Sequence, residues 1–144
     1  MNNQDFLWPF PPWRLSTAFL LVTLFSMISG GSSAFILVKL LNGDSFSRLA
    51  IVLIYALLFC AINITLILGK NKFVTALLLY QFTSIAIQAI GIITMGVASI
   101  NIFIVAIGVL SIFIINSSYY KGFIFYRKKH MNVIKTLKYN HTRE

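Results

Sequence analysis

Two glutamines, Gln81 and Gln88, lie within a stretch that is otherwise apolar, YQFTSIAIQAIG. An amide without a hydrogen-bond partner in hydrocarbon costs several kcal/mol, so both side chains need partners or water. Gln81, Ser84 and Gln88 follow one another at steps of three and four residues, which places them on one face of a helix. Two kinds of chemistry suit such a face. It can bond neighbouring helices together, or it can line a wet path through a membrane.

Comparable faces of small and polar residues occur in the other apolar stretches of the chain. Small residues allow helix backbones to approach closely, and hydroxyls and amides bond across helices where no water competes. We therefore expect Asn63 and the serines of other helices to be the partners of the two glutamines. Cys60, which shares a face with Asn63, is expected to be a small buried packing residue. The predicted intramembrane polar seam consists of Gln81, Ser84, Gln88, Asn63, Ser26, Ser29 and Ser111.

Residues able to support catalysis are scarce. A single cysteine excludes an intrachain disulfide and any chemistry that needs a cysteine pair. The acids are Asp5, Asp44 and Glu144, and both histidines, His130 and His141, lie in a basic C-terminal segment. Asp44 is expected to cap a helix. These residues predict a protein that is not an enzyme and that has no catalytic, cofactor-binding or metal-binding site and no cofactor.

The composition sets the class of protein that positions these residues. Of the 144 residues, 58% are hydrophobic and 10% are charged, and the mean hydropathy is +0.86. Soluble domains carry about 25% charged residues. The chain therefore has too few charges to cover a water-soluble surface, and we expect an integral membrane protein.

Charged residues bracket two apolar stretches of the roughly 20 residues that a membrane-crossing helix needs, and a third stretch, from 73 to 120, carries no charge and is long enough for two such helices. Runs that are apolar on all sides favour helices over the alternating pattern of barrel strands. The sequence therefore predicts an all-α bundle of four transmembrane helices within a domain covering 1–120, with a turn at 96–99. The predicted spans are about 16–38, 49–69, 73–95 and 100–119.

The distribution of basic residues predicts the orientation. Ten of the twelve Lys and Arg residues fall on the side of the two termini, and Lys39 and Arg48 fall on the other. Because cytoplasmic loops carry the excess of Lys and Arg, both termini are expected in the cytoplasm. The small size and short loops favour a bacterial inner membrane.

The segment 121–144 is predicted to be a short basic amphipathic tail lying on the anionic leaflet, with membrane lipids as partners and no nucleic acid. Tyr119, Tyr120 and Tyr126 are expected to form an interfacial belt beside it. The basic residues expected to face the lipid are Arg127, Lys128, Lys129, Lys135 and Lys138.

Two functional hypotheses follow. The first is a non-enzymatic membrane protein that acts through helix–helix interaction with a membrane partner, or through self-association. Immunity proteins, exclusion factors and accessory subunits have this architecture. The second is a small oligomeric channel or transporter for neutral solutes or weakly selected ions, lined by the face that carries Gln81 and Gln88. The absence of charge from 73 to 120 argues against proton coupling.

Overall fold

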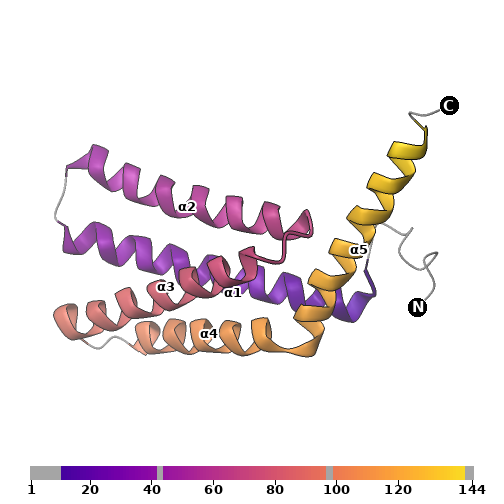
Figure 1. Cartoon of the computed structure of the whole chain (residues 1–144). Helices are drawn as coiled ribbons and strands as arrows, with labels where there is room; N and C mark the ends of the chain where they lie inside the picture. Colours follow the sequence, from indigo (N-terminus) through magenta and orange to yellow (C-terminus); the bar gives the residue numbers. More distant parts are fainter. Residues whose placement is uncertain (1–10, 42–43, 97–98, 142–144) are drawn as a thin grey trace.

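The structure is a computed structural model that describes residues 11–41, 44–96 and 99–141. Regular secondary structure in these ranges is helical throughout. In chain order the helices are α1 Trp13–Leu40, α2 Ser45–Ile67, α3 Phe73–Met95, α4 Ser99–Asn116 and α5 Ser118–His141. Figure 1 shows α1 to α4 running side by side, with α5 inclined to them at one end.

Three helices, α1, α2 and α3, are long and apolar enough to cross a membrane. α4 and α5 pass the same test only together, as a pair that bends by 57° at the break between them. The described part of the chain thus has three candidate spans, or four if the bent pair is one span. This confirms the expected class, an all-helical integral membrane protein.

The helix boundaries follow local capping chemistry. The predicted span 73–95 coincides with α3, and 16–38 lies inside α1. α3 ends at Gly96, whose φ of 87° a side chain would strain, and residues 97–98 of the predicted turn lie outside the described residues. The fourth helix ends earlier than predicted, because the Ser117 hydroxyl accepts a hydrogen bond from the Tyr120 amide (3.3 Å) and thereby starts α5.

Asp44 is the N-cap of α2, as predicted. Its Oδ1 accepts a hydrogen bond from the Ser47 backbone amide at 3.0 Å. Hydrogen bonds from the Ser47 side chain and then from its backbone amide hold the pKa of the Asp44 carboxyl below its usual value. The charged carboxylate also suits the positive end of the helix dipole.

Replacing Asp44 by alanine should loosen the first turns of α2, because no residue in 45–61 is buried to hold them in place. The native pKa is lowered, so the cap stabilises the helix above the unfolded pKa of about 3.8 and is lost as the pH falls through the native value. Hydrogen-exchange protection of residues 45–50 measures this. Asp44→Asn, which keeps an acceptor but cannot titrate, is the control. Unchanged protection in Asp44→Ala would contradict the capping role.

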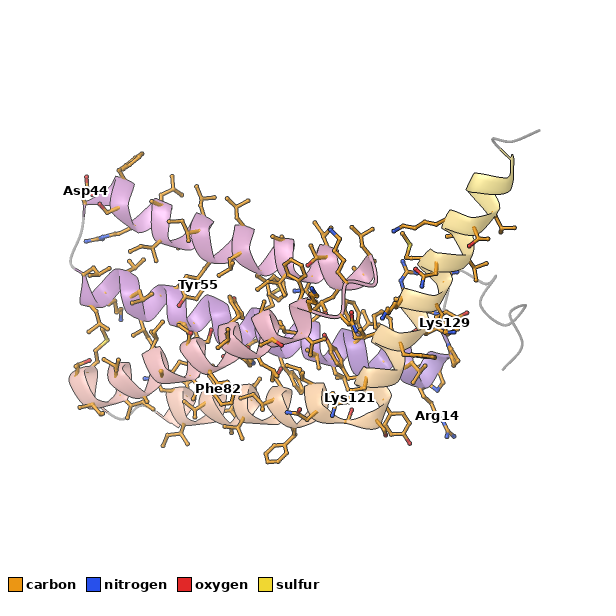
Figure 2. The ribbon with its side chains drawn as sticks, in the orientation of Figure 1. Arg14, Asp44, Tyr55, Phe82, Lys121 and Lys129 are labelled. Atoms are coloured by element: carbon orange, nitrogen blue, oxygen red, sulfur yellow. The ribbon has the colours of Figure 1, made fainter. Side chains whose placement is uncertain are left out.

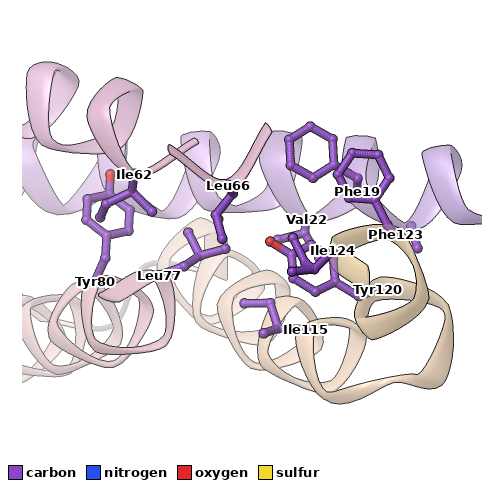
Figure 3. Close-up of a cluster of buried hydrophobic side chains, with 11 residues drawn as sticks. Phe19, Val22, Ile62, Leu66, Leu77, Tyr80, Ile115, Tyr120, Phe123 and Ile124 are labelled. Atoms are coloured by element: carbon purple, nitrogen blue, oxygen red, sulfur yellow. The ribbon is translucent and has the colours of Figure 1, made fainter. Parts of the chain in front are cut away.

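The apolar core lies at the end of the helices where α5 crosses α1 (Figure 3). Each helix contributes a fully buried side chain to it, and α1 contacts all four other helices. The rings of Phe19 and Phe123 stack with their centroids 4.3 Å apart, which ties α1 to α5. The fully buried apolar core residues are Val22, Leu66, Leu77, Ile115 and Tyr120.

The start of the segment 121–144 is packed into this core. Phe123, Ile124 and Tyr126 are buried. The predicted domain boundary at residue 120 therefore falls within one packed helix. The predicted tyrosine belt is wrong for Tyr120 and Tyr126, which face inward, whereas Tyr119 is 52% exposed. The reason is the spacing of Tyr120, Phe123 and Ile124, which forms an apolar stripe that docks on α1.

Of the basic residues predicted to face lipid, Lys128, Lys129 and Lys135 are exposed, and Arg127 is half-buried. The side chain of Lys138 lies outside the described ones. Arg127 Nε donates a hydrogen bond to the Ile67 carbonyl oxygen at 2.8 Å. A cation at that position suits the negative C-terminal end of α2.

The connection between α2 and α3 lies directly against α5. Gly69 has a φ of 77°, and a Cβ atom placed on it would lie 2.8 Å from Lys128 Cα and 2.9 Å from Lys128 N. Both the left-handed conformation and the close approach of the α5 backbone require glycine. Gly69 and Arg127 together fasten α5 to the end of α2.

Candidate functional site

The residues of the predicted polar seam are all buried, and they come from α1, α2, α3 and α4. The one with measurable exposure is Asn63, at 7%. α3 packs against both α1 and α4, so its polar face meets theirs. The predicted faces are thus turned inward, but the pairing of individual side chains differs from one glutamine to the other.

Gln88 is held by α1. Its Nε2 donates to the Ser29 carbonyl oxygen at 2.9 Å, and it lies 3.1 Å from Ser29 Oγ and 3.2 Å from Ser33 Oγ. The Ser33 hydroxyl in turn lies 2.9 Å from the Ser84 carbonyl oxygen. This cluster is a polar clasp between α1 and α3, and interhelical bonds of this kind contribute about 0.6–2 kcal/mol each. Sequence reasoning left Ser33 out of the seam, although it lies one turn after Ser29.

Gln81 has a different environment, although it lies on the same face of α3. It is fully buried, and within the described part of the chain neither its Nε2 nor its Oε1 has a hydrogen-bond partner. The Ser84 hydroxyl and Gln88 Oε1 share this condition. All three residues have zero exposed area, so no water-sized space touches them. The expectation that Gln81 has a partner is therefore wrong for the described residues.

Asn63 pairs with α1 instead of with a glutamine. Its Oδ1 accepts a hydrogen bond from Thr23 Oγ1 at 3.3 Å, and its Nδ2 donates to the Phe59 carbonyl oxygen at 2.9 Å. Thr23 was missed by the sequence prediction. Elsewhere in the seam, the hydroxyls of Ser26 and Ser111 lie 3.4 Å apart and link α1 to α4.

The prediction that Cys60 is buried is wrong, because the residues of α2 before Ile62 are not buried against the other helices. Cys60 is an exposed free cysteine, and the buried residues of α2 are Ile62, Asn63 and Leu66, near its C-terminal end. The helix therefore leaves an open space beside α1.

This space is a groove of about 770 Å³, which we name the α1–α2 groove. Tyr80 of α3 lies at its floor, with its hydroxyl directly over Gly30. Both walls carry small side chains among larger apolar ones. The small residues of the walls are Gly30, Gly31, Ala34, Ala56 and Cys60.

A second cavity, of about 440 Å³, lies between α5 and the start of α3, and we name it the basic cleft. On the α3 side it is lined by Asn71 and Val74, and Tyr120 also lines it. One face of α5 forms the other wall, through Lys121, Ile124, Phe125, Lys128, Lys129 and Asn132. Figure 2 places Lys121 and Lys129 at the end of the molecule opposite Asp44.

Among the described residues, no group of three or more His, Cys, Asp and Glu side chains could hold a metal ion. Comparison with protein-family models, with curated proteins and with solved structures found no match. The function must therefore be inferred from the geometry of the seam, the groove and the cleft.

Proposed function

We propose that this chain is a non-enzymatic integral membrane protein that binds a transmembrane helix of a partner protein in the α1–α2 groove. The observation that carries the proposal is the groove itself, an apolar space of about 770 Å³ walled by two candidate spans. An immunity, exclusion or accessory-subunit role is of this kind.

The chemistry of the groove favours a helix as its occupant. Gly31 is exposed, and a Cβ atom placed on it would meet nothing within 4 Å. On the facing wall, Ala56 and Cys60 are one helical turn apart and also exposed. Small residues on both walls let a third helix backbone approach closely, which is how transmembrane helices gain packing energy in lipid.

In the membrane we propose four spans, with the bent pair α4 and α5 as the fourth, arranged as one bundle. The distribution of Lys and Arg supports cytoplasmic termini, and the short loops between the helices support a bacterial inner membrane. In this orientation the basic C-terminal half of α5 lies at the cytoplasmic surface, and the end of the α1–α2 groove that is lined by Arg48 lies toward the other leaflet.

The alternative function, a channel lined by the face of Gln81 and Gln88, has less support. A conducting path needs side chains that water can reach, and these two residues have zero exposed area. Gln88 is moreover occupied in the clasp with Ser29. The seam therefore fits a structural role between α1 and α3 better than the lining of a pathway.

The native cysteine provides a direct test of groove occupancy. A photo-crosslinker attached to Cys60 in native membranes should capture a partner helix. Gly31→Leu should abolish the capture, because the new side chain enters the groove from a position where an added Cβ atom meets nothing within 4 Å. The matched control carries Cys60→Ser with Phe113→Cys, since Phe113 lies on α4 and is 71% exposed.

Capture from Cys60 that Gly31→Leu removes and Phe113→Cys does not reproduce would support the proposal. A crosslink to a second copy of this chain would identify self-association as the interaction. Crosslinks to lipid alone, or protein capture that is equal from both positions, would contradict it.

A further inference from the structure

The wall that α5 contributes to the basic cleft is a single face of that helix. Lys121, Lys128 and Asn132 are separated by seven and four residues, so they lie above one another on the helix surface. Ile124 and Phe125 fall between them on the same face. The cleft therefore combines an apolar lining with a row of cationic and amide groups.

The cationic charge of the cleft has no carboxylate near it among the described side chains. Lys121, Lys128 and Lys129 line the cavity, and Asp44, the acid among the described residues, lies at the far end of the helices (Figure 2). Lysine ammonium groups close together repel one another unless an anion lies between them. The cleft is thus suited to an anionic ligand.

The level of the cleft relative to the bilayer follows from its other wall. Asn71 and Val74 stand on either side of Phe73, where α3 begins as a candidate span. A residue at the start of a span lies at the boundary between hydrocarbon and headgroups. The side chains of the cleft therefore lie at the depth of lipid phosphates on the side that carries most of the basic residues.

Two amide side chains add neutral hydrogen-bond donors to the lysines of the cleft. Asn71 and Asn132 both line the cavity, one from each wall. Their NH₂ groups can donate to the oxygen atoms of an anionic ligand.

We propose that the basic cleft binds the phosphate headgroup of one anionic phospholipid. Basic pockets between helices on the cytoplasmic side are a known kind of headgroup site. The apolar residues Val74 and Ile124 are suited to the glycerol and the first methylenes of the acyl chains. The site differs from a diffuse attraction of the C-terminal segment to the membrane surface, because it holds one lipid in a cavity. It does not depend on the α1–α2 groove.

The test compares two variants of equal charge. The full-length protein is placed in nanodiscs that contain phosphatidylglycerol in a phosphatidylcholine background, and bound lipid is counted by native mass spectrometry. The cleft variant carries Lys121→Gln, Lys128→Gln and Lys129→Gln. The control carries Lys70→Gln, Lys72→Gln and Lys135→Gln, which do not line the cleft.

We expect the cleft variant to lose about 100-fold in affinity for phosphatidylglycerol, since each lysine that faces the phosphate within the cleft contributes a factor of about five. The control should lose much less. Asn132→Trp, which changes no charge and places a large ring at an exposed position lining the cleft, should also lower lipid retention. Circular dichroism checks that each variant keeps its helices.

An equal loss in the two triple variants would overturn the proposal, because it would indicate general electrostatic attraction. Retention of lipid by the cleft variant would also overturn it. A competition experiment with inorganic phosphate distinguishes a lipid headgroup from free phosphate as the ligand of the cleft. If millimolar phosphate displaces the lipid and binds the detergent-solubilised protein equally well, a free phosphate is the ligand and the assignment to lipid is wrong.

Discussion

Replacing Gly69 by alanine should destabilise the protein by about 3 kcal/mol. The left-handed backbone costs an alanine roughly 1–2 kcal/mol, and overpacking against a neighbouring element costs about 1–3 kcal/mol. Both terms apply, because Gly69 has a φ of 77° and its Cβ position lies 2.8 Å from Lys128 Cα. That neighbour is the backbone of α5, which cannot move aside as a flexible side chain can.

Gly69→Ala should also affect the attachment of α5, because Gly69 lies beside the hydrogen bond from Arg127 to Ile67 that joins α5 to α2. Displacement of α5 should break that bond and loosen the aromatic stack of Phe19 on Phe123. The free energy of unfolding in mixed micelles measures the first effect. Hydrogen exchange in α5 measures the second.

Two other glycines separate the contributions. Gly96 has a φ of 87° and a ψ of 163°, a region essentially restricted to glycine, but open space around its Cβ position, so Gly96→Ala should cost about 1–3 kcal/mol of backbone strain alone. Gly31 lies within α1 with open space and no unusual φ, so Gly31→Ala should be neutral or slightly stabilising. A loss at Gly69 no larger than the roughly 1–2 kcal/mol of backbone strain would show that the contact with α5 contributes nothing.

The two glutamines of α3 should respond in opposite directions to the same change. Gln88→Leu removes the clasp to Ser29 and Ser33 and should lower the free energy of unfolding by about 2 kcal/mol. Gln81→Leu should raise it by about 1–2 kcal/mol, because the amide it removes is buried without a hydrogen-bond partner among the described residues.

The two substitutions are matched in chemistry, depth of burial and helix face, so each is the control for the other. Unfolding in mixed micelles, followed by circular dichroism, gives both values. Destabilisation by Gln81→Leu as large as that by Gln88→Leu would show that Gln81 has a partner of its own. Ion or solute flux in liposomes, measured in parallel, should be absent from the wild type and unchanged in both variants.

Much of the architecture was predictable from local patterns. Charged residues bracket the apolar stretches, and the span predicted at 73–95 coincides with α3. The steps of three and four from Gln81 to Gln88 identified the face of α3 that is buried. Asp44 was predicted as a cap because a short acceptor before an apolar run is a local signal. In each case the relevant neighbours lie within one or two helical turns.

Other features could not be read in this way. The basic residues of the segment 121–144 predicted a tail on the membrane surface, although the stripe of Tyr120, Phe123 and Ile124 is also visible in the sequence. The spacing of that stripe is compatible both with packing against other helices and with exposure to the membrane. The bend between α4 and α5 decides between the two. Cys60 was predicted to be buried for a similar reason, because periodicity does not show that α2 is buried only near its C-terminal end.

The sequence by itself determined the membrane class, the apolar helices and the polar face of α3. The tertiary structure decided that Gln88 meets Ser29 and Ser33, and that Gln81, on the same face, meets no partner in the described residues. The physical reason is one of range. A helix face is fixed by residues a few positions apart, whereas the atoms it meets depend on how neighbouring helices are offset and inclined, which contacts distant in the sequence determine.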